Sequence, residues 1–236
     1  MNNSYYETLD ENFNNAVEFL ETEYTHLQLL EMLKNGNIPQ KQVSALKLDT
    51  IKSKEEGSIL VSNLTGQDGK IREAVSLRLK EFMSDKNLIE FFKSKDNYKT
   101  FLDAIIDING NICRNIISAV SNLKNDENFC RIFIPQLENL TLELLETVEQ
   151  FDFQDGKYKV NKEAFKLYWC LETIYVFYDK LDFIKLKEII LRAKNIKEYT
   201  IREKTAKILS HNFTDKELLS VKSELKQDSN YYVRRY

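Results

Sequence analysis

A short sequence motif recurs along the chain at intervals of roughly 40 residues. Each copy begins with Ile or Val, three copies continue with Arg, and the four full copies carry apolar or small residues four and eight positions further on. The copies begin at Ile71, Ile112, Val160, Ile201 and Val233, so their spacings are 41, 48, 41 and 32 residues. Repetition at this period is typical of stacked helical hairpins. The motif therefore predicts an all-α solenoid.

The rest of the sequence also favours helices. The 236 residues include only 6 Gly and 2 Pro, which are too few turn-formers for a many-stranded sandwich or barrel. Apolar residues recur every three or four positions over 6–30, after a capping box at Ser4 and Glu7. A second capping box, Thr214 and Glu217, begins the last of the further helices that we predict. These cover residues 39–53, 56–64, 69–84, 86–94, 97–107, 110–124, 128–150, 160–179, 182–194, 197–212 and 214–227.

The repeated motif resembles the second helix of HEAT repeats. The resemblance covers roughly residues 36–236 and is carried by a turn, Ile or Val followed by Arg, and an apolar helix, as in Ile71-Arg72, Ile201-Arg202 and Val233-Arg234. It implies a right-handed α-α superhelix of about five helical hairpins, continuous over 36–236. Residues 1–35 are then expected to form an acidic N-terminal capping region.

The match to the HEAT pattern is uneven. The family usually has an Asp six residues before the Arg, and this Asp pairs along the stack; only Asp228 matches that place. Cys113 and Asn161 stand where Arg is expected in the second and third copies. We expect Arg72, Arg114 and Arg202 to act structurally, by hydrogen bonding at the helix starts. The structural positions of the repeat are Arg72, Arg202 and Arg234.

The resemblance also implies a binding surface, because in HEAT proteins the second helices line the concave face. Positions 2, 6, 9 and 13 after the start of each copy lie opposite the core positions of the helix. The basic and aromatic residues that we predict to bind a partner there are Lys80, Arg114, Lys162, Lys166, Trp169 and Lys207. For Trp169 burial is the favoured alternative, because residues 164–178 are apolar around almost the whole helix.

Residue patterns that would support catalysis or metal binding are missing from the sequence. The two histidines, His26 and His211, are far apart and stand in no metal-ligand spacing. Residues 66–71 imitate a phosphate-binding loop but lack its glycine spacing and the Ser or Thr after Lys70. We therefore expect no enzyme activity, no metal and no cofactor.

Charge is distributed unevenly along the chain, although its net value is only −3. Residues 1–33 contain seven acidic and no basic residues, whereas residues 180–236 contain 14 basic and 8 acidic ones. The three cysteines form no CxxC pair, and neither a signal peptide nor an apolar membrane span stands out, so we expect a cytoplasmic protein.

Three functions remain open at this level. The first is a non-catalytic scaffold that binds a protein or peptide through a mildly basic concave groove, an acidic partner being one candidate. The second is a nucleic-acid-binding or DNA-glycosylase-like HEAT protein, against which the small number of arginines and the acidic isoelectric point of 5.7 argue. The third is a subunit that assembles through its acidic and basic ends. Because Val233 begins a copy that is not completed, we also expect either a longer array or a last turn covered by another subunit.

Overall fold

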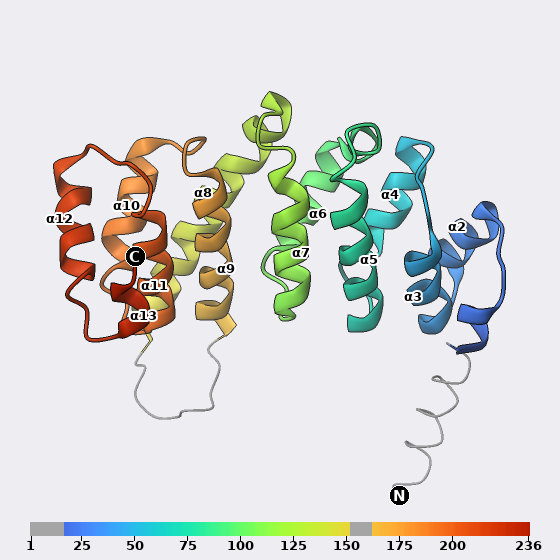
Figure 1. Ribbon diagram of the computed structural model, residues 1–236, viewed down its shortest axis with the longest axis horizontal. Coiled ribbons are helices and arrows are strands. Elements are labelled where there is room, and N and C mark those ends of the chain that lie inside the picture. The colour runs from blue at the N-terminus through green and yellow to red at the C-terminus, as the bar shows by residue number, and fades with distance from the viewer. Residues whose placement is uncertain (1–16, 152–161) are drawn as a thin grey trace, which may run out of the picture. The chain divides into compact units, whose positions relative to one another are not determined.

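The computed structural model describes residues 17–151 and 162–236, and all regular secondary structure in these ranges is helical (Figure 1). The chain divides into two compact units, which we describe separately. Unit 1 comprises Met1–Ala104 and Asn109–Asn122, and unit 2 comprises Ile105–Ile108 and Leu123–Tyr236. The all-α prediction is therefore confirmed for the described residues.

Unit 1 consists of helical hairpins stacked in two layers. Its elements are α2 (His26–Asn35), α3 (Ile38–Lys47), α4 (Lys54–Ser62), α5 (Gly69–Phe82), the 3₁₀ helix η1 (Ile89–Phe92), α6 (Lys95–Ala104) and α7 (Gly110–Ser121). The odd-numbered helices α3, α5 and α7 pack side by side, and α2, α4 and α6 form the second layer. Each element thus packs against its neighbours along the stack, as the repeat predicts.

Unit 2 repeats this arrangement. It contains α8 (Glu127–Glu149), α9 (Lys162–Phe177), α10 (Phe183–Ala193), α11 (Tyr199–Ile208), α12 (Lys216–Leu225) and α13 (Tyr231–Arg234). The odd-numbered helices α9, α11 and α13 form one layer, and α8, α10 and α12 form the other. Glu138, buried on α8, accepts a hydrogen bond from the backbone N–H of Asp182 and forms an ion pair with Lys185. It therefore joins α8 to the first turn of α10.

The first residue of each repeat copy lies in the core. Ile71, Ile112, Ile201 and Val233 are buried in the first turn of an odd-numbered helix, and the apolar residues that follow them at helical spacing are buried as well. Val160, which begins the third copy, lies outside the described residues. Burial of this row of side chains is what joins each odd-numbered helix to its neighbours.

Two predicted helix starts are wrong. The apolar stripe over 6–30 does not form one helix, because the chain leaves the helix at Thr22 and α2 begins only after Thr25. Thr25 and Gln28 form a capping box there, which supplies a new helix start inside a continuous apolar pattern. The start of that stripe, with the Ser4 capping box, lies outside the described residues. At α12 the cap is Asp215 rather than Thr214.

The boundary expected at residue 36 falls inside the first hairpin. Gly36 and Asn37 form the connection between α2 and α3, which pack against each other. Within residues 17–151 and 162–236, no helix combines the length and apolar character needed to cross a membrane.

Candidate functional site

Four odd-numbered helices, α5, α7, α11 and α13, begin in the same way. Three residues before each buried repeat residue, an acidic or amide side chain caps the helix by accepting a hydrogen bond from the backbone N–H two residues further on. These caps are Asp68, Asn109, Glu198 and Asn230. The sequence prediction missed them, although three of them stand in the polar turns that precede the copies.

The repeated arginines bind the turn that leads into their own helix. Arg202 donates to the carbonyl oxygens of Ile196 and Lys197 at 2.9 and 2.6 Å. Arg72 donates to the carbonyl of Gln67, and Arg234 donates to those of Asp228 and Ser229. Each carbonyl lies five or six residues before its arginine, so these side chains fasten the turn to the helix start, which is a structural role.

In unit 2, one repeated arginine forms an ion pair with the next hairpin along the stack. Arg202 of α11 contacts Asp228, in the turn before α13, with Nε–Oδ2 and Nη2–Oδ1 distances of 2.6 and 3.2 Å. Hydrogen bonding from Arg202 lowers the pKa of Asp228 below its ordinary value, although burial partly opposes this. Asp228 stands out in the sequence because it lies six residues before the repeated Arg234. In the structure it binds Arg202, the repeated arginine of the preceding copy.

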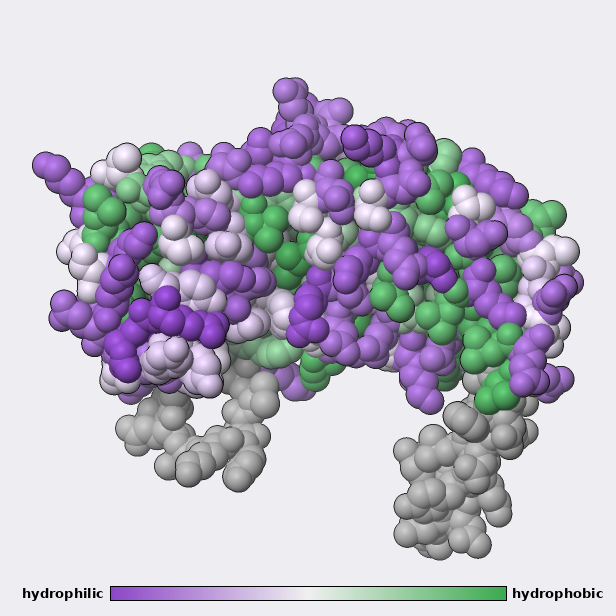
Figure 2. Space-filling model, in the orientation of Figure 1, coloured by the Kyte–Doolittle hydropathy of each residue, from purple (hydrophilic) through white to green (hydrophobic). Residues whose placement is uncertain are grey.

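In unit 1, the predicted partner-facing positions of α5 and α7 are accessible. Lys80 and Leu77 are exposed on α5, with 41% of Leu77 accessible, and Arg114 is exposed on α7. Glu73 of α5 accepts hydrogen bonds from Asn109 and Asn111, at 3.2 and 2.9 Å, so the two helices are also joined on this side. Figure 2 shows hydrophilic and hydrophobic residues side by side on this part of the surface.

Helix α9 departs from the predicted pattern. Lys162 is exposed and Lys166 is half-exposed, where it forms an ion pair with Glu163 at 3.0 Å. Trp169, however, is only 6% accessible, and Thr173 is fully buried. The prediction that Trp169 lies on an open surface is therefore wrong. The favoured alternative, burial, predicted from the apolar circumference of the helix, is confirmed. Position counting failed because α9 buries a wide part of its circumference, including Leu167, Trp169, Cys170 and Thr173.

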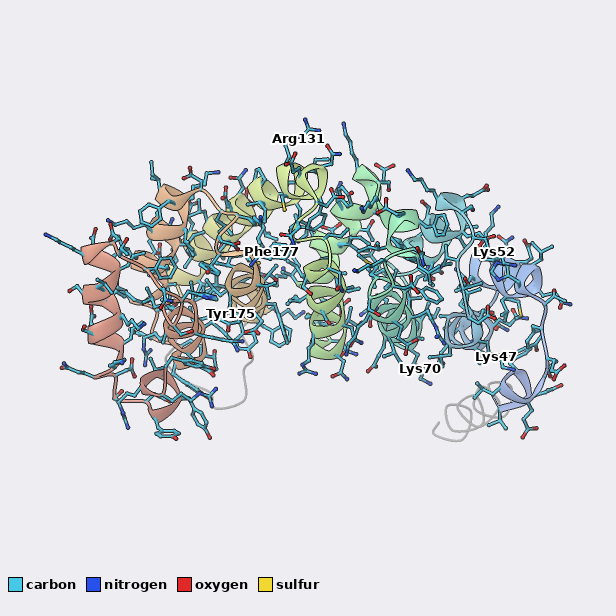
Figure 3. The ribbon with its side chains drawn as sticks, turned by 45° about the horizontal axis from the view of Figure 1, so that its top comes forward. Lys47, Lys52, Lys70, Arg131, Tyr175 and Phe177 are labelled. Carbon is cyan, nitrogen blue, oxygen red and sulfur yellow. The ribbon has the colours of Figure 1, made fainter. Side chains whose placement is uncertain are left out.

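A row of half-buried residues on α9 lies against α11. We call the resulting group the Tyr–Lys cluster: Tyr168, Glu172 and Tyr175 of α9 with Lys204 and Lys207 of α11. Glu172 binds both lysines, with oxygen–nitrogen distances of 2.9 Å to Lys204 and 2.5 Å to Lys207. Each ammonium also lies over a tyrosine ring, 4.5 Å from the centre of Tyr168 and 4.3 Å from that of Tyr175, which is labelled in Figure 3.

The row of rings continues along α9 and beyond α11. His211 stacks on Tyr178 with ring centres 3.6 Å apart and on Tyr175 with centres 4.7 Å apart. Its Nε2 lies 3.0 Å from the carbonyl oxygen of Tyr175, and because a carbonyl only accepts, this nitrogen carries a hydrogen. Lys124 lies over Tyr178 and pairs with Asp179 at 2.7 Å.

The charges of the Tyr–Lys cluster are stabilised in place. Burial raises the pKa of Glu172, but the hydrogen bonds from Lys207 and Lys204 outweigh it and hold the pKa below its ordinary value. Burial lowers the pKa of Lys204, while its contacts with Tyr168 and Glu172 raise it, and the raising effects dominate. Both groups therefore stay ionised across the neutral range, and the predicted basic residue Lys207 is largely balanced by Glu172.

The described residues show no constellation for metal binding or thiol chemistry. In residues 17–151 and 162–236, no three His, Cys, Asp or Glu side chains are grouped so that they could hold a metal ion. Burial raises the pKa of the Cys170 thiol to about 12 and also raises that of Cys130. Thiols with raised pKa values are poor nucleophiles, because the thiolate is the reactive form.

Comparisons with known proteins add similar folds at low identity. No family model and no curated protein matches the chain. An engineered protein from a structural genomics consortium has a TM-score of 0.49 and 16% identity, with 90% of this chain and 95% of that one covered. A second engineered protein gives 0.48 and 13%, covering 90% and 93%. A designed armadillo repeat protein gives 0.46 and 12%, covering 89% and 95%. By the packing of its own helices, the chain is a helical-repeat protein.

Proposed function

We propose that this protein is a scaffold that binds a protein segment on the odd-numbered helices of unit 2, with the Tyr–Lys cluster as the main contact. The observation that carries the proposal is the row of half-buried tyrosines, Tyr168, Tyr175 and Tyr178, held beside two lysines. Tyrosine is enriched among the residues that dominate protein interfaces, because it buries a large rigid ring and keeps a polar group.

Preorganisation supports a binding role for this cluster. Ordering a flexible lysine on binding costs roughly 0.5–1.5 kcal/mol for each side chain that becomes fixed. Lys204 and Lys207 are already fixed by Glu172 and by the rings of Tyr168 and Tyr175. A partner therefore meets a surface that is largely in its bound form.

The chemistry of the cluster defines the expected partner. The ring faces favour apolar or cationic groups. Lys204 is buried, whereas Lys207 is more accessible, and its ammonium retains N–H donors beyond the one that Glu172 uses, since an ammonium has three. We expect an extended segment that presents apolar side chains and a carboxylate. The exposed Lys162 and the half-exposed Lys166 are proposed as secondary contacts in unit 2. The exposed Lys80 and Arg114 are proposed as contacts for a segment that binds unit 1.

A peptide selection tests the proposal. The immobilised full chain is used to select from a displayed library of random peptides, and the recovered peptides are titrated by fluorescence anisotropy. Tyr175→Ala should weaken binding by at least about tenfold, which corresponds to about 1.4 kcal/mol. Lys207→Gln should weaken peptides that contain a carboxylate more than their amide analogues.

Matched controls make the result specific. Tyr199→Ala removes a tyrosine from α11 outside the cluster, and Lys216→Gln removes an exposed lysine from α12; both should bind like the wild type. If Tyr175→Ala and Tyr199→Ala had the same affinity as the wild type, the cluster would not be the binding site. A single-stranded DNA oligonucleotide is titrated in parallel, because nucleic-acid binding would appear as an affinity that falls steeply with salt.

A further inference from the structure

An exposed aromatic surface surrounds α13 in unit 2. We call it the α13 patch, and it consists of Tyr199, Tyr231, Tyr232, Arg235 and Tyr236. Tyr231 and Tyr232 are 66% and 51% accessible, and the ring of Tyr232 lies 5.7 Å from that of Tyr231 and 6.3 Å from that of Tyr199. The guanidinium of Arg235 lies over the rings of Tyr232 and Tyr236, at 5.5 and 5.0 Å. These residues support one another without being covered.

The α13 patch has the composition and charge of an interface. Tyrosine and arginine are the residues that interface cores favour over ordinary surface. Residues 226–236 contain three basic residues, Lys226, Arg234 and Arg235, against one acidic residue, Asp228, which is engaged by Arg202. Arg235 pairs with Glu203 of α11 at 2.7 Å, so the excess positive charge comes from Lys226 and Arg234. Over α11 and α13, Figure 2 shows strongly hydrophilic residues beside nearly neutral ones. A partner for this patch should therefore be acidic and partly apolar.

Unit 1 of the same protein presents such a surface. The acidic segment, which we define as residues 17–31, carries exposed Glu18, Glu21, Glu23 and Glu31 and contains neither Lys nor Arg. It also exposes apolar side chains, those of Val17, Leu20 and Leu27, the last being 75% accessible. The segment is fastened to α3, because Lys47 donates to the carbonyl of Thr22 at 2.6 Å and lies over the ring of Tyr24.

We propose that the α13 patch of one copy binds the acidic segment of a second copy. The two surfaces are opposite in charge, and each mixes exposed apolar or aromatic groups with its charged ones. Two α13 patches would bring like charges together, which opposes a symmetric contact. A contact between two different surfaces of identical chains leaves one of each surface free, so copies add in a row until the row closes into a ring. This contact is independent of the Tyr–Lys cluster.

Sedimentation velocity of the full chain tests the proposal. The average mass should rise with protein concentration at low salt, and the apparent dissociation constant should rise at least about tenfold at roughly 1 M salt, where screening shortens the range of charges to about 3 Å. A mass that stays at the monomer value at every concentration in low salt would overturn the proposal.

Charge reversal identifies the two surfaces. Arg234→Glu with Arg235→Glu reverses the α13 patch, and Glu18→Lys with Glu21→Lys reverses the acidic segment. Each double variant alone should associate at least about tenfold more weakly, because like charges then meet. Mixing the two double variants should restore association, since their reversed surfaces are again complementary. Association that survives reversal of the acidic segment, or a mixture that stays monomeric, would contradict the assigned pairing.

A variant that keeps the charge, and a charge change placed elsewhere, separate this contact from general charge effects. Tyr231→Ala removes an exposed ring without a change in charge and should weaken association about tenfold. Lys80→Glu changes the charge of unit 1 by the same amount as one arginine reversal but lies on α5, and it should associate like the wild type. Tyr175→Ala should also associate normally, so a failure here is distinguishable from a failure of peptide binding. Circular dichroism melts establish that each variant is folded.

Discussion

At the residue scale, the repeated arginine is the most informative side chain. Arg202 satisfies two carbonyl oxygens of its own turn and the carboxylate of Asp228 in the next hairpin. Its side chain and that of Asp228 are largely buried, with 16% and 9% accessible. A planar guanidinium suits this task because it presents five N–H donors in a fixed geometry.

We predict that Arg202→Ala lowers the free energy of unfolding by about 2 kcal/mol, because it strands a buried carboxylate and two carbonyls. Urea unfolding followed by circular dichroism measures the change. Arg202→Lys should recover only part of the loss, since an ammonium cannot reach all four oxygens in the same geometry. An Arg202→Ala protein as stable as the wild type would refute the role of this side chain.

Trp169 carries a second prediction. It is the only tryptophan of the sequence, so tryptophan fluorescence reports on the surroundings of this one side chain. Burial against Phe165 and Tyr168, in edge-on ring contacts, should shift its emission to the blue and protect it from iodide quenching. Trp169→Ala should lower the free energy of unfolding by about 3–5 kcal/mol. Emission like that of free tryptophan, with full quenching, would show that the ring is exposed.

The burial of Trp169 could be predicted from the sequence, whereas the contacts of the Tyr–Lys cluster could not. The apolar circumference of 164–178 was enough to favour burial of Trp169. Position counting pointed the other way because it assumes that every helix buries the same positions, whereas the buried part of α9 depends on packing against residues far away in sequence. The Tyr–Lys cluster was missed for the same reason: Glu172 and Lys204 are 32 residues apart, and no local pattern joins them.

At the element scale, the pairing of α9 with α11 depends on the ions between them. Glu172 stands between Lys204 and Lys207, so its removal leaves two ammonium groups close together, one of them almost fully buried. The helices themselves were foreseeable, since the predicted ranges from 39–53 onward each overlap a helix of the structure. Their starts were harder, because capping depends on one side chain, and Thr214 and Asp215 are both good caps.

We predict that Glu172→Gln lowers the free energy of unfolding at neutral pH by about 2 kcal/mol. The pKa of Glu172 is lower in the folded than in the unfolded chain, so its contribution is complete above the unfolded value of about 4.3 and is lost as pH falls through the folded value. The pKa of Lys204 is raised by folding, so its contribution is complete below about 10.4 and is lost as pH rises through the folded value.

Urea unfolding of wild type and Glu172→Gln at several pH values checks this. The difference between the two proteins should be constant from about pH 5 to pH 10 and should shrink in more acidic solution. Glu163→Gln, which breaks the exposed pair with Lys166, is the matched control and should change stability by less than about 1 kcal/mol. A difference that grows in acid would contradict the assigned ionisation.

At the scale of the whole molecule, the repeat period was readable from the sequence, but the division into two units was not. The period follows from residues that are buried in every copy, such as Ile71 and Ile201. The division depends on how many contacts join neighbouring hairpins, and the sequence does not give those contacts. HEAT membership stays a prediction, as does the continuous domain over 36–236.

We predict that the two units respond separately to a core cavity. Leu79→Ala in α5 removes a fully buried side chain and should speed amide hydrogen exchange in α3, α5 and α7. Exchange in α11 and α12 should stay unchanged, because each hairpin is stabilised by its neighbours. Ile189→Ala in α10 is the reciprocal control. Hydrogen-exchange mass spectrometry that found equal acceleration in both units would refute this independence.

The repeated arginines bind carbonyl groups that precede them in the chain, and this has a consequence for folding during synthesis. Arg72, Arg202 and Arg234 each bind carbonyls that precede them by five or six residues, so those partners have already left the ribosome when the arginine emerges. Each turn can therefore be locked during synthesis, before the next hairpin exists. We expect stalled nascent chains to gain protease resistance one hairpin at a time, and Arg202→Ala to delay only the step at α11.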